Sequence, residues 1–305
     1  MEHLTVATRS GALALAQTKT VIALLKNIYP ELQVGIKEIT TSGDSDRRTA
    51  LWNLKDTGFF TSQIEDALLA DQADFAVHSF KDMPTQQKVG LKIAAVCDRN
   101  FVEDCLLCHR PLDSIKQLPK DSKIGTSSLR RAAQFKHLRS DIEVVPIRGN
   151  VKTRIKKLEG SDYDAIVLAR AGLERLGLGE KISLVFDPTE FIPAPAQGAL
   201  AIQTRIDDKR TNEIVAAIND KQVEIETAAE RKILTVLQCG CHAPVGAFAK
   251  IIDSQIKIQA FISNVDGTNY ITKTKEGNAA EAETIAENLA KELLTSGGKE
   301  ILKNI

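Results

Sequence analysis

A lysine and an aspartate follow directly on a short apolar run near residue 80. The run from 75 to 77 predicts a buried strand, and Lys81 and Asp82 stand where that strand should end. Open α/β sheets bind their ligands outside the carboxyl ends of strands, so the pair would be within reach of a substrate. The alternative is a solvated ion pair, which is common on protein surfaces.

Basic residues gather between residues 120 and 157, where eleven lysines and arginines stand against three acids, a difference of eight. Arg130 and Arg131 fall in the first turn of a predicted helix, where the helix dipole disfavours cations unless an anion is bound. Ser127 and Ser128 supply hydroxyls at the same turn. The pattern predicts an anion-binding site, with a solvated basic face as the alternative.

Other arginines also follow predicted strand ends. They are Arg9 after the first strand, Arg148 and Arg154 at the next strand-to-helix turn, and Arg170 and Arg175 after a later strand. Several basic turns facing one aspartate suggest a polyanionic substrate whose reacting centre becomes cationic.

The overall composition argues against nucleic-acid and membrane partners. The 40 basic and 40 acidic residues cancel, and aromatic residues make up only 5% of the chain. No apolar run approaches the roughly 20 residues that span a bilayer, and no charged and then apolar leader opens the sequence. We therefore expect a cytoplasmic protein. Neither a Walker loop nor a complete dinucleotide fingerprint is present.

Strands and helices alternate through the first two thirds of the chain, which predicts parallel sheets with helices on both faces. The predicted strands are 4–8, 34–39, 75–77, 91–96, 123–126, 142–146, 165–169 and 199–203, and the main helices are 13–28, 128–138 and 151–158. Ser62 to Glu65 forms a capping-box pattern that begins another helix. Residues 41–57 predict a long loop of the lid type.

The pattern changes after residue 220, where a helix, three strands (245–249, 257–263 and 270–274) and a last helix (281–294) predict a small α+β domain. A length of 305 residues calls for two or three domains. The predicted domains are residues 1–98 with 198–218, residues 99–197, and residues 219–305.

The five cysteines are an odd number in a large chain and argue against a disulfide framework. Cys105, Cys108 and His109 match the pattern for covalent c-type haem, but their place in a predicted apolar strand favours buried, inert thiols. A zinc site would need the second group, Cys239 and Cys241 with its neighbouring histidine, and is also disfavoured.

Spaced motifs along nearly the whole chain resemble the porphobilinogen deaminase (hydroxymethylbilane synthase) family. They are Ala7-Thr8-Arg9, Gly58-Phe59-Phe60, the run from His78 to Pro84, Gly125 to Arg131, Arg148-Gly149-Asn150, Thr153-Arg154, Ala194 to Ala199 and Gly240-Cys241. The resemblance implies an α/β fold with two periplasmic-binding-protein-like, doubly wound domains. A small C-terminal α+β domain would carry the cofactor cysteine.

The resemblance also implies the reaction. Cys241 would hold a dipyrromethane cofactor through a thioether, and four porphobilinogen molecules would be added to it head to tail with release of ammonia. Hydrolysis would then free hydroxymethylbilane. A buried carboxylate at Asp82 would stabilise the azafulvenium cation and carry protons.

The same resemblance distributes the binding roles and implies a monomer. The expected cofactor-binding residues besides Cys241 are Lys81, Ser127, Ser128, Arg130, Arg131, Phe60 and Gln197. The expected substrate-binding residues are Arg9, Arg148, Arg154 and Arg175. No metal is expected. Guanidiniums would bind the acetate and propionate groups of the pyrrole rings.

Five positions depart from the family pattern: Gly11 replaces a serine, Asn53 and Thr57 replace lid lysines, Cys239 replaces a glycine, and His242 is an unusual neighbour of Cys241. The alternative function is a non-catalytic, two-lobed binding protein for an organic polyanion. Such a protein would share the fold but would need neither Cys241 nor the third domain.

Overall fold

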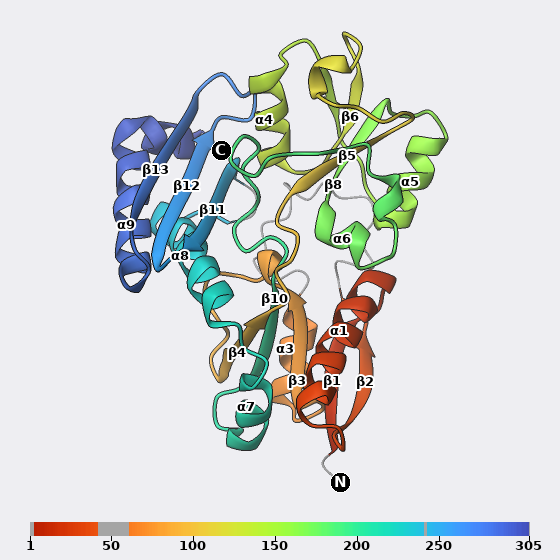
Figure 1. Cartoon of the computed structure of the whole chain (residues 1–305), viewed down its shortest axis with the longest axis vertical. Coiled ribbons are helices and arrows are strands. Elements are labelled where there is room, and N and C mark those ends of the chain that lie inside the picture. The colour runs from red at the N-terminus through yellow and green to blue at the C-terminus, as the bar shows by residue number, and fades with distance from the viewer. Residues whose placement is uncertain (1–2, 42–60, 241–242, 305) are drawn as a thin grey trace. The chain divides into compact units, whose positions relative to one another are not determined.

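The computed structural model describes residues 3–41, 61–240 and 243–304 (Figure 1). These residues form two compact units. The first contains residues 3–41, 61–100 and 198–224, and the second contains residues 101–197, 225–240 and 243–304. Because the second unit holds two sheets, it spans most of the predicted second and third domains. The predicted three-domain division therefore stays a prediction.

The first unit is built on a five-stranded sheet with the order β2-β1-β3-β10-β4. Its strands are β1 (His3–Arg9), β2 (Gln33–Ile39), β3 (Phe75–Ser79), β4 (Leu91–Cys97) and β10 (Leu200–Arg205). Its helices are α1 (Ala12–Ile28), α3 (Ser62–Leu69) and α7 (Lys209–Ala216). Side chains of β3 alternate between the two faces of the sheet, as its period of two requires.

Both faces of this sheet are buried against helices. Phe75 packs with α1 residues such as Val21 and with Val215 of α7. Ala76, on the opposite face, packs with Ile64 of α3. This two-sided burial explains why β3 reads as a continuous apolar run rather than an alternating one.

The second unit contains a sheet of the same design, with the order β7-β6-β8-β5-β9. Its strands are β5 (Asp104–Cys108), β6 (Lys123–Gly125), β7 (Glu143–Val145), β8 (Ala165–Ala169) and β9 (Leu184–Val185). The helices α4 (Leu129–Leu138), α5 (Val151–Glu159) and α6 (Arg170–Glu174) accompany it. Phe135 of α4 packs on one face with Leu106, and Ile155 of α5 packs on the other with Leu107.

The predicted doubly wound α/β class is confirmed, but the prediction of purely parallel sheets is wrong. In each sheet the fourth strand, β10 or β5, runs antiparallel to its neighbours on both sides. Both strands follow a point where the chain passes from one unit to the other. A strand that enters after such a passage is not bound by the crossover geometry that makes consecutive βαβ strands parallel.

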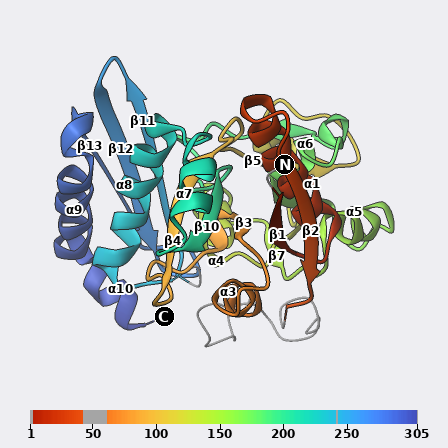
Figure 2. The ribbon, with the colours of Figure 1, turned by 90° about the horizontal axis from the view of Figure 1, so that it is seen from below.

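A three-stranded antiparallel sheet, β11 (Val245–Ile252), β12 (Gln255–Ser263) and β13 (Tyr270–Asn278), completes the second unit. Alternate β12 residues such as Ile256 and Ile258 share one core with helices α8 (Lys221–Leu237) and α9 (Ala282–Leu293). Figure 2 shows α9 beside β13. The short α10 (Lys299–Lys303) follows α9. The predicted α+β character of this region is confirmed.

The opposite face of that sheet contacts α4 through a stack of three rings. The Tyr270 ring lies 4.1 Å from that of His137 and 4.7 Å from that of Phe261. Gly267 lies so close to α4 that an added Cβ would stand 2.5 Å from the carbonyl oxygen of Ala133. The sheet that follows Cys239 in the sequence is thus fixed against α4, the helix that carries Arg130 and Arg131.

Some local details differ from the sequence analysis or lie outside the described residues. The predicted capping box is wrong, because α3 begins at Ser62 and its N-cap is Thr61, whose side chain makes no capping bond. Helix α7 was not predicted at all. Most of the predicted lid loop lies outside the described residues. Within the described ranges, no helix is both long and apolar enough to cross a bilayer.

Candidate functional site

The predicted lysine and aspartate lie where the sequence places them, at the carboxyl end of β3. Strand β3 passes into a single short turn of 3₁₀ helix, Phe80–Asp82. Since β1 and β3 run parallel, Arg9 at the end of β1 and the segment after β3 lie at the same edge of the sheet. This edge is the ligand-binding edge of open α/β sheets.

The Asp82 side chain is exposed, so the expectation of a buried carboxylate is wrong in this structure. Lys81 is half-buried. The segment itself is well anchored: the backbone N–H of Phe80 donates to the carbonyl of Ala199 at 3.0 Å. The Gln17 amide donates to the Ser79 hydroxyl at 2.7 Å. The backbone is therefore held while the carboxylate stays accessible.

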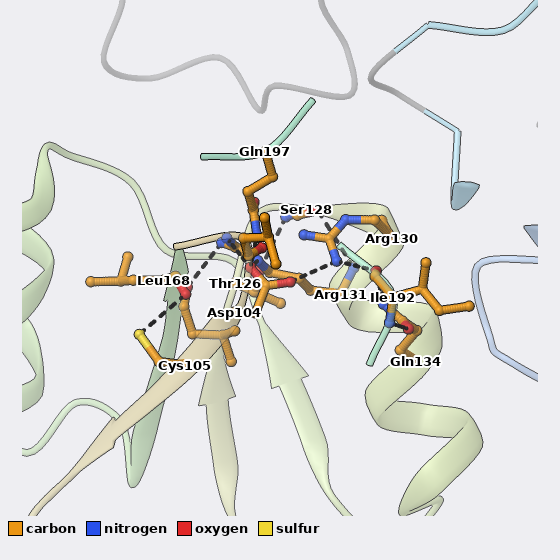
Figure 3. A network of polar contacts seen from close by, with 12 residues as sticks. Asp104, Cys105, Thr126, Ser128, Arg130, Arg131, Gln134, Leu168, Ile192 and Gln197 are labelled. Atoms are coloured by element: carbon orange, nitrogen blue, oxygen red, sulfur yellow. Dashed lines mark hydrogen bonds and ion pairs between the residues drawn. The ribbon is translucent and has the colours of Figure 1, made fainter. Parts of the chain in front are cut away.

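The two arginines predicted at the first turn of α4 converge on one carboxylate, Asp104, as Figure 3 shows. Arg131 makes a two-pronged contact with Oδ1 of Asp104, at 3.0 Å from Nε and 2.7 Å from Nη2. Arg130 donates from Nη1 to Oδ2 at 2.7 Å. All three side chains are at most 8% exposed. Desolvation lowers the pKa of Arg130, and Asp104 acts in the opposite direction.

Sequence reasoning missed Asp104. The residue opens β5, which pairs antiparallel with β8, so Asp104 lies opposite Ala169 at the carboxyl end of β8. Its partners on α4 are 26 and 27 positions away, and only the direction of β5 brings them together. The available signal was an acid at the start of an apolar strand. The Asp104 carboxylate therefore supplies some of the negative charge that was expected from a bound anion at this helix start.

The remaining predicted residues around α4 complete this network. Gln197 is fully buried and its amide donates to Asp104 Oδ1 at 3.0 Å and to the Val102 carbonyl at 2.9 Å. Ser127 exchanges hydrogen bonds with the backbone of Ile147, at 2.7 and 3.1 Å. Ser128 is the N-cap of α4 and accepts from the backbone of Arg131. Ser127 and Ser128 thus fix the turn itself.

A second group of arginines lies at the turn between β7 and α5. Arg154 is half-buried, and its Nε donates to the Gly149 carbonyl at 2.7 Å. Its pKa is lowered to about 10, mainly by desolvation and also by the nearby charges of Arg131 and Arg148. Guanidiniums that lie this close together suit a ligand with several carboxylates.

The other predicted positions are spread over both units or are not described. Arg175 is the half-buried C-cap of α6. Gly11 is the exposed N-cap of α1, and Cys239 is half-buried. Phe60, Cys241, His242, Asn53 and Thr57 lie outside the described residues, so their predicted roles stay predictions.

The expectation of buried, inert thiols fits Cys105, whereas Cys108 is only half-buried. Cys105 is buried in β5, and desolvation raises the pKa of its thiol to about 12. Its Sγ donates to the Leu168 carbonyl at 3.5 Å, whereas Cys108 Sγ donates to the Arg110 carbonyl at 2.8 Å. A thiol that stays protonated is a poor nucleophile and metal ligand. Among the described residues, no group of three potential ligands could hold a metal ion.

The fold and the arginine turns define a class: an α/β protein of two doubly wound sheets and a small third sheet, with anion-binding groups at strand ends. Residues 4–213 match the family described as porphobilinogen deaminase, dipyromethane cofactor binding domain, and residues 225–295 match its C-terminal domain. The chain belongs to the porphobilinogen deaminase family.

Individual relatives agree over the full length. The chain is 41% identical to the porphobilinogen deaminase of Deinococcus radiodurans, covering 100% of this chain and 99% of the relative. It is 40% identical to that of Maridesulfovibrio salexigens over 305 residues, with 100% and 99% covered. The methionine-binding protein MetQ superposes with a TM-score of 0.45 at 12% identity, covering 75% of this chain and 94% of MetQ.

Family membership confirms the predicted activity and favours it over a non-catalytic binding protein. The chain is a transferase that builds hydroxymethylbilane from porphobilinogen on a dipyrromethane cofactor. The described residues fit such a cofactor: its acetate and propionate groups call for several cations, and Arg131 and Arg148 lie near enough to Arg154 for their charges to lower its pKa.

Proposed function

We propose that the polymerisation uses Asp82 as the reacting carboxylate, the arginine turns as carboxylate-binding groups and Cys241 as the cofactor attachment. The observation that carries this assignment is the arginine group around Arg154, whose pKa is lowered by burial and also by the charges of Arg131 and Arg148. A polyanionic ligand relieves that repulsion, and the relief contributes to the free energy of binding.

Asp82 is suited to charge that develops on the substrate. Loss of ammonia from porphobilinogen breaks a carbon–nitrogen bond and leaves a cationic methylene carbon. A carboxylate beside that carbon stabilises the cation, and it can take the proton released from the ring carbon after the new bond forms. Asp82 is accessible to a substrate and sits on an anchored backbone, which suits both tasks.

The remaining assignments follow from place and charge. Lys81 and Arg9 lie at the same sheet edge as Asp82 and bind substrate carboxylates. Arg148, Arg154 and Arg175 bind further carboxylates in the second unit. Arg130 and Arg131 pair with Asp104 and also bind the cofactor. Gln197 and the two serines fix the turn that precedes α4. Phe60 stacks near the cofactor.

The attachment is tested by the intact mass of the purified protein. We expect two extra pyrrole units, and Cys241→Ser should remove them. Cys239→Ser is the matched control and should keep them. Loss of the adduct in the Cys239 variant alone would reassign the attachment to that thiol.

The role of Asp82 is tested by Asp82→Ala in protein that carries the adduct. We expect loss of turnover by about a hundredfold or more, since removal of a charge-stabilising group costs factors of this size. Asp207→Ala, an exposed acid of the same unit, is the control and should turn over normally. Substantial turnover by the Asp82 variant would refute this role.

We further propose that the enzyme is a cytoplasmic monomer. The resemblance to the family supports a monomer, and the absence of a charge excess speaks against a membrane surface as partner. Light scattering on the eluting protein, with a mass near 33.3 kDa expected, tests the oligomeric state. A mass of twice that value would overturn it.

A further inference from the structure

A buried polar cluster lies on the α3 side of the first sheet, behind the segment that carries Asp82. Gln203 of β10 is fully buried at its centre. Its side-chain amide nitrogen donates to Glu65 Oε1 at 3.1 Å and to Gln87 Oε1 at 3.0 Å. Its side-chain oxygen lies 3.1 Å from Nε2 of His78.

The orientation of every group follows from one carbonyl. The oxygen of Pro84 can only accept, so the Gln87 nitrogen must face it, at 3.3 Å. The Gln87 oxygen then faces Gln203 and requires the Gln203 nitrogen, which leaves the Gln203 oxygen for His78. That oxygen can only accept, so His78 carries its proton on Nε2.

The ring of His78 is neutral in this arrangement. Its pKa is lowered to about 4, mainly by desolvation and also by the charge of Arg9, while the bond to Gln203 acts in the opposite direction. Among the residues that the structure describes, the charged groups that face the cluster are Arg9 from β1 and Glu65 from α3. A neutral, singly oriented histidine is therefore a fixed support rather than a proton carrier at neutral pH.

The strand that carries Gln203 is regular where it pairs with β3, with Gln203 opposite Ala76 and Ala201 opposite His78. The register shift between Ile202 and Gln203 belongs to β4, where Ala94 is the extra residue. Buried polar side chains need hydrogen-bond partners, and Gln203 supplies one to His78 and one to Glu65.

The contacts of Gln203 reach both ends of the segment from 78 to 84: its oxygen contacts His78, and its nitrogen contacts Gln87, which in turn bonds Pro84. His78 precedes Asp82 by four residues, and Pro84 follows it by two. We propose that Gln203 is a positioning residue for the reaction, and that it holds the segment from 78 to 84 so that the Asp82 carboxylate meets the reacting carbon. The inference rests on the proposed role of Asp82. It predicts an effect on kcat with little effect on KM, because Gln203 touches no substrate-binding arginine in the contacts above.

The test is Gln203→Glu in adduct-bearing enzyme. The new carboxylate still accepts from His78, but it offers no donor to Glu65 or Gln87. At pH 8 we expect kcat to fall by about tenfold to a hundredfold, the range for a small misplacement of a reacting group, with KM within about twofold. Two facing carboxylates take up a shared proton as the pH falls, so kcat should recover toward pH 6.

Two further variants make the test specific. Gln203→Glu combined with Glu65→Gln exchanges donor and acceptor between these two positions, and it should restore part of kcat at pH 8, because the Gln87 oxygen still faces a carboxylate. Gln72→Glu is the matched control, because Gln72 is exposed on the same unit and its side-chain oxygen accepts from Lys37. Wild-type kcat in Gln203→Glu at pH 8, or no recovery in the double variant, would overturn the inference.

Folding failure and failure of the proposed function are separable. If Gln203→Glu does not fold, Gln87→Ala removes only the half-buried arm to Pro84 and should still lower kcat about threefold to tenfold. An unchanged kcat in Gln87→Ala would then overturn the inference. Asp82→Ala is measured alongside. Turnover in Asp82→Ala refutes the proposed function and this inference with it, whereas full turnover in Gln203→Glu with none in Asp82→Ala refutes the positioning role alone.

Discussion

Replacing Asp104 with asparagine tests the central charge balance of the second unit. The carboxylate is fully buried and compensates two guanidiniums that are themselves 5% and 8% exposed. Asparagine keeps the shape of the aspartate but removes its charge. Its NH2 group also faces guanidinium N–H groups, and two donors cannot bond each other. Removal of one partner from a buried ion pair costs about 3 to 5 kcal/mol. Asp104→Asn should lose an amount in this range.

That loss is large beside the usual stability of a folded domain, which is about 5 to 15 kcal/mol. At about 2 to 4 °C per kcal/mol, the thermal midpoint should fall by roughly 10 °C. Guanidinium unfolding followed by circular dichroism, together with calorimetry, measures both quantities. Asp141→Asn is the control, because its ion pair with Arg139 is partly exposed and should matter much less.

A loss below about 1 kcal/mol in Asp104→Asn would refute the reasoning. It would mean that the two guanidiniums find water or backbone oxygens once the carboxylate is gone. Arg130 already donates to the Ile192 carbonyl at 2.8 Å, and Arg131 donates to the Val167 carbonyl at 3.0 Å. We expect these two bonds to persist without replacing the lost charge.

Three further predictions concern other parts of the chain. Arg154→Met removes a guanidinium whose pKa is lowered by burial and by like charges, so the thermal midpoint should stay unchanged or rise. KM for porphobilinogen should rise about tenfold or more, and an unchanged KM would contradict this prediction. The pKa of His78 is about 4 in the folded protein and 6.5 as its ordinary value, so the unfolded state binds the proton more readily. The free energy of unfolding should therefore decline by up to about 3 kcal/mol as the pH falls from 6.5 to 4. His78→Gln should flatten that slope, and an NMR titration of His78 near pH 6.5 would refute it. Gly267→Ala, at a φ of 74° and against α4, should cost about 1 to 3 kcal/mol in thermal unfolding; an unchanged midpoint would show that α4 gives way.

The sequence predicted the strands and helices that depend on local patterns. The apolar runs at 75–77 and 165–169 became β3 and β8, because both are buried on two faces and need no partner to be recognised. The return of 199–203 to the first sheet was also predicted. The direction of that strand was not, since direction depends on where the chain re-enters and leaves no trace in hydrophobic spacing.

The site was predicted in part for the same reason. Arginines in a first helical turn are visible as a local conflict with the helix dipole, so Arg130 and Arg131 were found. Asp104 resolves that conflict from a distant strand, and counting charges in a sequence window could not reveal it. The exposure of Asp82 likewise depends on how a single 3₁₀ turn leaves β3.

The position of β10 between β3 and β4 bears on how the nascent chain folds. While the ribosome makes the protein, β3 and β4 emerge long before the strand that joins them, and their neighbouring edges wait for residues 200–205. Strands β5 to β9, by contrast, all emerge as one continuous stretch between 104 and 185. Although it is synthesised first, the N-terminal sheet is therefore the later of the two to close, and its unpaired edges are where chaperones would be needed.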